Sequence, residues 1–213
     1  MQRPFFISLQ HYEGELPLEW LEPLAARLEH EDPRTALKFA AALIRHDPRA
    51  LEVVKRLLDD DKIDDKTRGE ALYALGCSMD SSVVPLIAQY TKDRENHIRE
   101  QAVKALGKLK ASKAFEELLK VVKDRKQTRT VRIKAGCALA RTNDMAHLKA
   151  MLTAMEKGAD FLAVCFSDPR NPEFPAALAA ALIRAAARGN DKLCKAIAGK
   201  LANYRDQEAE NAL

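Results

Sequence analysis

The chain has 213 residues, of which 47% are hydrophobic and 31% charged, a composition ordinary for a soluble protein with a sizeable core. Its opening segment has an apolar run too short for a signal peptide, and no stretch approaches the roughly 20 apolar residues that a helix needs to span a bilayer. The cysteines are widely spaced and form no C-x-x-C pair, which is typical of reduced thiols. We therefore expect a cytoplasmic protein that does not bind membranes.

The net charge of +4 is distributed unevenly along the chain. Residues 1–70 carry a balance of −4, residues 71–134 a balance of +7, and residues 135–213 a balance of +1. This distribution is typical of a solvated helical surface, and it also fits a docking surface with two electrostatic faces.

Sparse Gly and Pro, with abundant Ala, Leu, Lys and Glu, favour helices. Candidate capping residues precede several segments with helical apolar spacing: Asp32, Asp47, Ser81 or Ser82, Asn96, Thr128 or Thr130, and Asn143 or Asp144. In chain order, we expect helices at 18–28, 34–44, 50–58, 66–77, 83–91, 98–109, 113–123, 131–141, 145–157, 176–188 and 191–204. A short apolar segment, 161–166, and a proline-rich loop, 168–175, separate the last pair from the others.

One phrase occurs three times in the middle of the chain. RGEALYALG begins at Arg68, REQAVKALG begins at Arg99 and RIKAGCALA begins at Arg132, at steps of 31 and 33 residues. A nearly fixed period of this size indicates stacked supersecondary units. Two alanines recur three residues apart, and therefore on one helix face, where small side chains let neighbouring helices approach closely. These columns are Ala71/Ala102/Ala135 and Ala74/Ala105/Ala138, followed by Leu75/Leu106/Leu139.

Each copy follows an amphipathic helix and a turn that bears an aspartate, as in Asp93 before Arg99 and Asp124 before Arg132. This pattern resembles HEAT repeats, especially the short bacterial form related to phycobilin-lyase repeats. The resemblance implies a right-handed all-α solenoid, here of about five or six helix pairs, in which the arginines pair with the turn aspartates and neighbouring repeats.

We expect one continuous domain over residues 1–213. Within it, residues 1–30 would form an N-terminal cap and first helix, and residues 31–157 the recognisable repeats. Residues 158–205 would form divergent C-terminal helices, and residues 206–213 a frayed tail.

The resemblance also implies that the second helix of each unit lines a concave face, where solenoids most often bind their partners. The predicted partner-binding residues on this face are Glu70, Tyr73, Gln101, Lys104, Lys108, Lys134 and Arg141. Because the face becomes cationic towards the third copy, an acidic protein segment is the expected partner. A solvated inner face without a partner is the alternative.

The densest basic run lies between the second and third copies and offers another binding site, whose cations are Lys123, Arg125, Lys126 and Arg129. Such clusters bind phosphates, which makes nucleic acid the runner-up partner. No aromatic residue is interleaved for base stacking, so a solvated turn is the simpler interpretation.

Catalytic and metal sites have little support in the sequence. HEAT-like hydroxylases bind iron through several His-Glu dipeptides, whereas this chain has one, His30-Glu31. No H-x-x-x-H, H-E-x-x-H, P-loop or G-x-S-x-G motif is present. We therefore expect a non-catalytic adaptor, scaffold or assembly factor without metal or cofactor. A phycobilin-lyase-like enzyme is the third hypothesis.

Overall fold

The computed structural model describes residues 17–29, 32–166 and 173–211. In these residues the secondary structure consists of α-helices and short 3-10 helices without strands, so the all-α prediction is confirmed. The chain forms two compact units, Met1–Ala114 (unit 1) and Phe115–Leu213 (unit 2), and each is described by itself. The single continuous domain stays a prediction.

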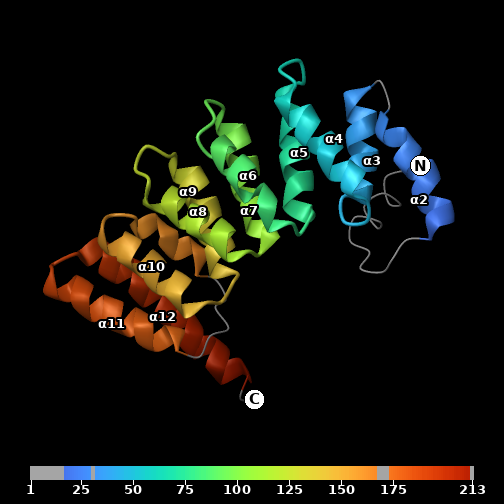
Figure 1. The fold of residues 1–213 in the computed structure, drawn as a ribbon. Coiled ribbons are helices and arrows are strands. Elements are labelled where there is room, and N and C mark those ends of the chain that lie inside the picture. Colours follow the sequence, from blue (N-terminus) through green and yellow to red (C-terminus); the bar gives the residue numbers. More distant parts are fainter. Residues whose placement is uncertain (1–16, 30–31, 167–172, 212–213) are drawn as a thin grey trace. The chain divides into compact units, whose positions relative to one another are not determined.

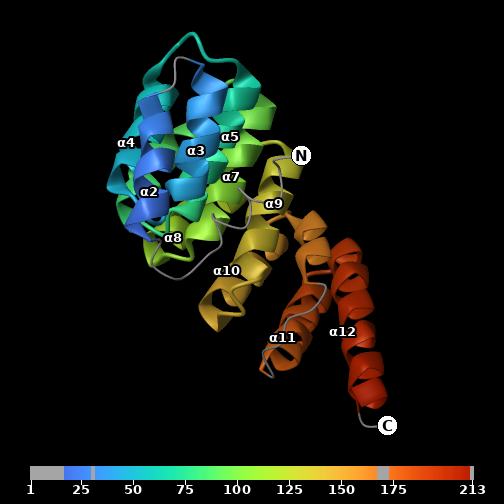
Figure 2. The ribbon, with the colours of Figure 1, turned by 90° about the vertical axis from the view of Figure 1, so that its right-hand side faces the viewer.

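Unit 1 stacks its helices in chain order, as in an α-solenoid (Figure 1). Its elements are α2 (Leu18–Ala25), η1 (Ala26–Glu29), α3 (Pro33–Leu43), α4 (Pro48–Asp59), α5 (Asp65–Cys77), η2 (Ser81–Val83), α6 (Val84–Tyr90) and α7 (Asn96–Leu109). Helices α3, α5 and α7 lie side by side (Figure 2). Helix α4 packs on α3 and α5, and α6 packs on α7. Each repeat therefore contributes its second helix to a common row.

Aspartates begin several helices of unit 1. The carboxylates of Asp32, Asp47 and Asp64 accept hydrogen bonds from main-chain N–H groups in the first turns of α3, α4 and α5. We expected a serine cap before residue 83, but Asp80 caps η2 instead. Asn96 is itself the first residue of α7 and not its cap.

Small and branched side chains fill the contact between neighbouring repeats. The alanine and leucine columns of the first two copies are fully buried, at Ala71, Ala74, Leu75, Ala102, Ala105 and Leu106. In the third copy Ala135 and Leu139 are also buried, whereas Ala138 is half-buried. The predicted small-residue contact between repeats is therefore present, and Ala138 is its one less buried position.

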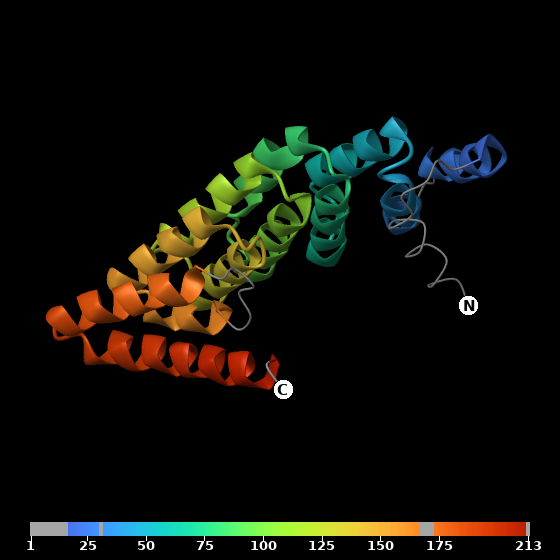
Figure 3. The same cartoon turned by 90° about the horizontal axis from the view of Figure 1, so that it is seen from below.

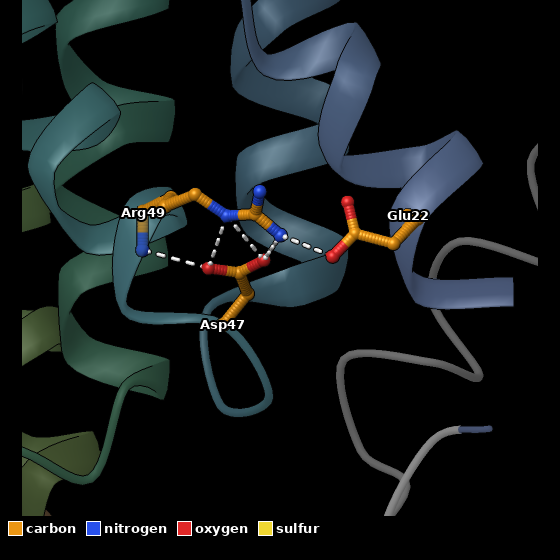
Figure 4. A network of polar contacts seen from close by, with 3 residues as sticks. All are labelled: Glu22, Asp47 and Arg49. Atoms are coloured by element: carbon orange, nitrogen blue, oxygen red, sulfur yellow. Dashed lines mark hydrogen bonds and ion pairs between the residues drawn. The ribbon is translucent and has the colours of Figure 1, made fainter. Parts of the chain in front are cut away.

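A polar network joins α2 to the start of α4 (Figure 4). The Asp47 carboxylate, only 4% exposed, accepts hydrogen bonds from the main-chain N–H of Arg49 (2.8 Å) and from its guanidinium (2.6 Å to Nη2). Arg49 Nη2 also contacts Glu22 Oε1 at 3.3 Å. The Arg49 side chain lowers the pKa of Asp47, so the buried carboxylate stays ionised and paired.

Unit 2 also consists of helices packed in chain order. It contains most of α8 (Ser112–Lys123), then α9 (Arg129–Ala140), α10 (Met145–Glu156), η3 (Asp160–Cys165), α11 (Phe174–Ala187) and α12 (Asp191–Asn211). Helices α11 and α12 lie side by side as a hairpin (Figure 3). Glu156 anchors α10 to α11 through Arg184 (2.9 Å to Nε) and Arg188 (3.0 Å to Nη1).

Two elements of unit 2 differ from expectation. The apolar segment 161–166 forms the 3-10 helix η3, which packs on α9, α10 and α12 in the place of a full second helix. Helix α12 continues to Asn211, beyond the expected end at residue 204, because residues 206–211 contain neither Gly nor Pro.

Candidate functional site

The best-defined part of the predicted binding face lies on α5 and α7, which meet at Gly76. A Cβ atom built at Gly76 would lie 2.6 Å from the Cα of Ala105 and 2.7 Å from its carbonyl oxygen. Contacts this short leave no room for a side chain, so the two helices touch backbone to backbone. The close approach brings the outward-facing side chains of α7 over those of α5.

A tyrosine and two lysines form the centre of this surface. The Nζ atoms of Lys104 and Lys108 lie 4.6 Å and 4.8 Å from the centroid of the Tyr73 ring. Both distances are within the range of a cation–π interaction. We call Tyr73, Lys104 and Lys108 the Tyr–Lys cluster. The sequence columns predicted these residues for one face, and the structure brings them into contact.

The Tyr–Lys cluster is strongly cationic. Contact with Tyr73 raises the pKa of Lys108, against the opposite effect of partial burial, so this lysine stays charged at neutral pH. Burial raises the pKa of the neighbouring Cys77, while the charges of Lys108, Arg45 and Lys104 act in the other direction. Among the described residues, neither lysine of the cluster forms an ion pair. The positive charge is therefore available to an anionic partner.

The other two predicted residues of unit 1, Gln101 on α7 and Glu70 on α5, each lie near the second helix of the preceding repeat. Gln101 packs against Gly69 of α5, since a Cβ at Gly69 would lie 3.1 Å from its Cγ. The hydrogen bond to Asp64 raises the pKa of Arg34 on α3, and the charge of the exposed Glu70 adds a smaller contribution in the same direction. Gln101 therefore helps to hold α7 against α5, while Glu70 remains on the surface near Arg34.

The two remaining predicted residues of this face, Lys134 and Arg141, belong to α9 and its C-cap in unit 2. Both are exposed, and they flank Cys137 on the same helix face. A strip that continues from the Tyr–Lys cluster to these residues stays a prediction.

The basic loop of unit 2 is partly engaged in intramolecular contacts. Arg125 donates a hydrogen bond to the carbonyl oxygen of Lys157 (3.0 Å), and the Arg129 guanidinium lies 5.3 Å from the Phe161 ring centroid. Lys123 and Lys126 are exposed. Phe161 was not among the residues predicted for this site because it is distant in sequence, although it begins an apolar segment one repeat further along the chain.

The arginines of the second and third copies bind main-chain carbonyl oxygens, whereas Arg68 of the first copy lies 3.7 Å from the Asp65 carboxylate. Arg99 donates to the carbonyl oxygens of Asp93 (2.8 Å) and Arg94 (2.9 Å), so Asp93 contributes its main chain and not its carboxylate. Arg132 likewise donates to the carbonyl oxygen of Val122 (2.8 Å) and lies over Phe161. Arg34 reaches the next repeat, where its guanidinium contacts Asp64 at 2.6 Å. These arginines therefore hold turns together.

In the described residues, no three His, Cys, Asp or Glu side chains lie close enough together to bind a metal ion. His147 contacts the Thr142 hydroxyl through Nδ1 (2.9 Å) and stacks edge-on against Phe115. The dipeptide His30-Glu31 lies outside the described residues. No described helix is long and apolar enough to cross a bilayer.

The geometry defines an all-α protein built from stacked helix pairs, with a cationic and aromatic surface on the second helices of two repeats. Residues 62–140 match the family model of HEAT repeats. Over these residues the resemblance predicted from the repeated phrase is confirmed. No curated protein matches the chain.

Two solved structures share some similarity with the chain. The first is an engineered protein with 17% identity and a TM-score of 0.45, covering 87% of this chain and 96% of its own. The second is human deoxyhypusine hydroxylase in complex with glycerol, with 16% identity and a TM-score of 0.37, covering 94% of this chain and 88% of its own. At these TM-scores neither likeness defines a function for this chain.

Proposed function

We propose that this chain is a non-catalytic adaptor or assembly factor that binds an acidic segment of another protein at the Tyr–Lys cluster. HEAT repeats generally mediate protein interactions, which gives the general class. The observation that supports the specific site is the pair of lysines held over Tyr73 without a carboxylate partner in the described part of the chain. An exposed lysine and a half-buried lysine on an aromatic ring suit a carboxylate-rich peptide that also carries apolar side chains.

The test uses a fluorescein-labelled oligoglutamate peptide and the full chain, with binding followed by anisotropy. Lys104→Glu with Lys108→Glu should weaken binding by about tenfold or more, because two attractive charges become repulsive. Binding should also weaken as salt rises, since exposed charges are screened over about 8–10 Å at physiological ionic strength.

The matched control reverses two other exposed lysines of unit 1, Lys66 and Lys92, and therefore changes the net charge equally. This double variant should retain affinity within about threefold. Equal weakening by both double variants would show that only net charge matters and would contradict the proposed site. Unchanged helicity and melting temperature would establish that each variant is folded.

Nucleic acid is the second candidate, because one observation favours it. Phe161 lies next to Arg129 and Arg132, with 4.9 Å between its centroid and the Arg132 guanidinium carbon. This places an aromatic ring beside the basic loop, where the sequence showed none. Stacking on aromatic and guanidinium groups is the usual way in which proteins hold single-stranded bases.

A further inference from the structure

Two cysteines that are far apart in sequence meet inside unit 2. Cys137 on α9 and Cys165 at the end of η3 are separated by 28 residues, yet their Sγ atoms lie 3.0 Å apart. Both are free thiols; Cys165 is buried and Cys137 is half-buried. This separation is close to one repeat length, so the spacing of the two cysteines in the sequence already indicates that they could lie on neighbouring elements.

A glycine makes this meeting possible. Gly136 occupies the position that holds Leu72 and Val103 in the other two copies of the repeated phrase. A Cβ atom at Gly136 would lie 2.9 Å from Leu162 Cδ2 and 3.1 Å from Cys165 Sγ. Without a side chain there, η3 can settle on α9 closely enough for the two sulfur atoms to touch.

Hydrogen bonds orient the two thiols. In the neutral pair, Cys137 donates to Cys165 Sγ, and Cys165 donates to the carbonyl oxygen of Ile133 at 3.3 Å. When one thiol ionises, the other can donate to it. This interaction lowers the pKa of Cys137, with a smaller contribution from the charge of Arg141, and it raises the pKa of Cys165. The more accessible sulfur is therefore also the better nucleophile near neutral pH.

We propose that Cys137 and Cys165 form a redox-active dithiol that closes into a disulfide when it meets a low-molecular-weight disulfide such as oxidised glutathione. The Cys137 thiolate attacks one sulfur of the oxidant, whose S–S bond breaks, and one glutathione thiolate leaves. Cys165 then loses its proton and attacks Cys137 Sγ, and the second glutathione leaves. The two cysteines lose two electrons and two protons, and the oxidant becomes two thiols.

The geometry needs little change for this reaction. The sulfur atoms must approach by about 1 Å to reach the disulfide bond length. A bridge between these residues would enclose α10 in a covalent loop and fix η3 to α9. A metal site fits less well, because no third ligand joins the pair among the described residues.

The experiment exposes the full chain to glutathione buffers of increasing oxidising power, blocks remaining thiols by alkylation and measures the intact mass. The oxidised chain should carry two alkyl groups fewer than the reduced chain and, once the alkyl groups are subtracted, should be about 2 Da lighter, the mass of two hydrogen atoms, without retaining glutathione. Peptide mapping should find the Cys137 peptide joined to the Cys165 peptide. The oxidised form should melt roughly 5–10 °C higher than the reduced form, because the bridge restricts the unfolded chain.

Single variants distinguish this pair from the other cysteines. Neither Cys137→Ser nor Cys165→Ser should form the disulfide, so the 2 Da decrease should be absent from both variants. Cys165→Ser should instead retain one glutathione on Cys137. Cys77→Ser and Cys194→Ser should still show the 2 Da decrease, as in the wild type. Because Cys165 is buried, its replacement could disturb folding, so circular dichroism first establishes that each variant is folded. Cys137→Ser changes a half-buried residue and is the less disruptive of the two substitutions. A bridge to Cys77 or Cys194, a bridge between chains, or no mass loss in any buffer would overturn the proposal.

Discussion

The carboxylate of Asp64 both caps helix α5 and pairs with an arginine of α3. Its Oδ1 accepts a hydrogen bond from the main-chain N–H of Thr67 in the first turn of α5 (2.9 Å). Its Oδ2 accepts a hydrogen bond from the guanidinium of Arg34 on α3 (2.6 Å). The Thr67 N–H and then Arg34 lower the pKa of Asp64 to about 2. Thr67 is buried and also accepts a hydrogen bond from Arg34 Nε (3.2 Å). The ionised form of Asp64 therefore stabilises the contact between two repeats.

This arrangement predicts how stability depends on pH. Because the folded pKa of Asp64 lies below the unfolded value of about 3.9, its contribution is present above pH 4 and is lost as the pH falls towards 2. Asp64→Asn keeps an oxygen that can cap the helix and removes the charge. The variant should melt below the wild type at pH 7, and the difference should shrink towards pH 2.

The control for this prediction is Asp61→Asn, which removes an exposed carboxylate before the same helix. Asp61 accepts no hydrogen bond in the described part of the chain. Its variant should show a nearly constant offset from the wild type across the same pH range. A pH-independent offset for Asp64→Asn would contradict the role of its charge.

Residues that act locally were easier to predict than those that act across repeats. Asp32 and Asp47 were predicted as caps, and Thr128 and Asp144 were each one of two candidates, because a cap is defined by its own next few residues. The contact of Tyr73 with two lysines depends on how α7 sits on α5. The repeat columns placed these residues on one face but could not give the distances.

At the scale of the element, Gly76 sets the spacing of α5 and α7. Alanine normally stabilises a helix interior by about 1 kcal/mol relative to glycine. At Gly76 the added Cβ would lie 2.6 Å from the backbone of Ala105, so the two helices would have to separate. We expect Gly76→Ala to lower the free energy of unfolding by roughly 1–3 kcal/mol, measured by urea denaturation.

Gly199 provides the matched comparison, because it lies in α12 and a Cβ added there would meet nothing within 4 Å. Gly199→Ala should be neutral or stabilise the protein by up to about 1 kcal/mol. Ala105→Leu should destabilise by roughly 1–3 kcal/mol, since it overpacks the same contact from the other side. A Gly76→Ala variant as stable as Gly199→Ala would show that the helices do not touch there.

The repeats were predictable as elements where the repeated phrase is intact. The phrase gave the bounds of α5, α7 and α9 within about two residues because its alanines and leucines must face a neighbouring helix. Segment 161–166 has no such phrase, and its short helix η3 depends on the space above Gly136. The sequence showed the glycine but not what would fill that space.

At the scale of the whole molecule, the positive charge is concentrated in residues 71–134, with a balance of +7. This excess includes the lysines of the Tyr–Lys cluster and the cations of the basic loop. In the loop, Arg125 and Arg129 already contact Lys157 and Phe161, which leaves Lys123 and Lys126 as its more available charges. A protein partner would therefore bind the positive charge of the Tyr–Lys cluster, and a nucleic acid that of the basic loop.

The dependence of DNA binding on salt distinguishes these two functions. Each phosphate that the protein neutralises on duplex DNA contributes about −0.9 to the slope of log affinity against log salt. With two available loop lysines, we expect a slope no steeper than about −2 to −3 and negligible binding at about 0.15 M salt. Lys123→Glu with Lys126→Glu should remove this weak binding while oligoglutamate capture persists. Tight DNA binding at about 0.15 M salt with a slope near −6 would instead favour the nucleic-acid function.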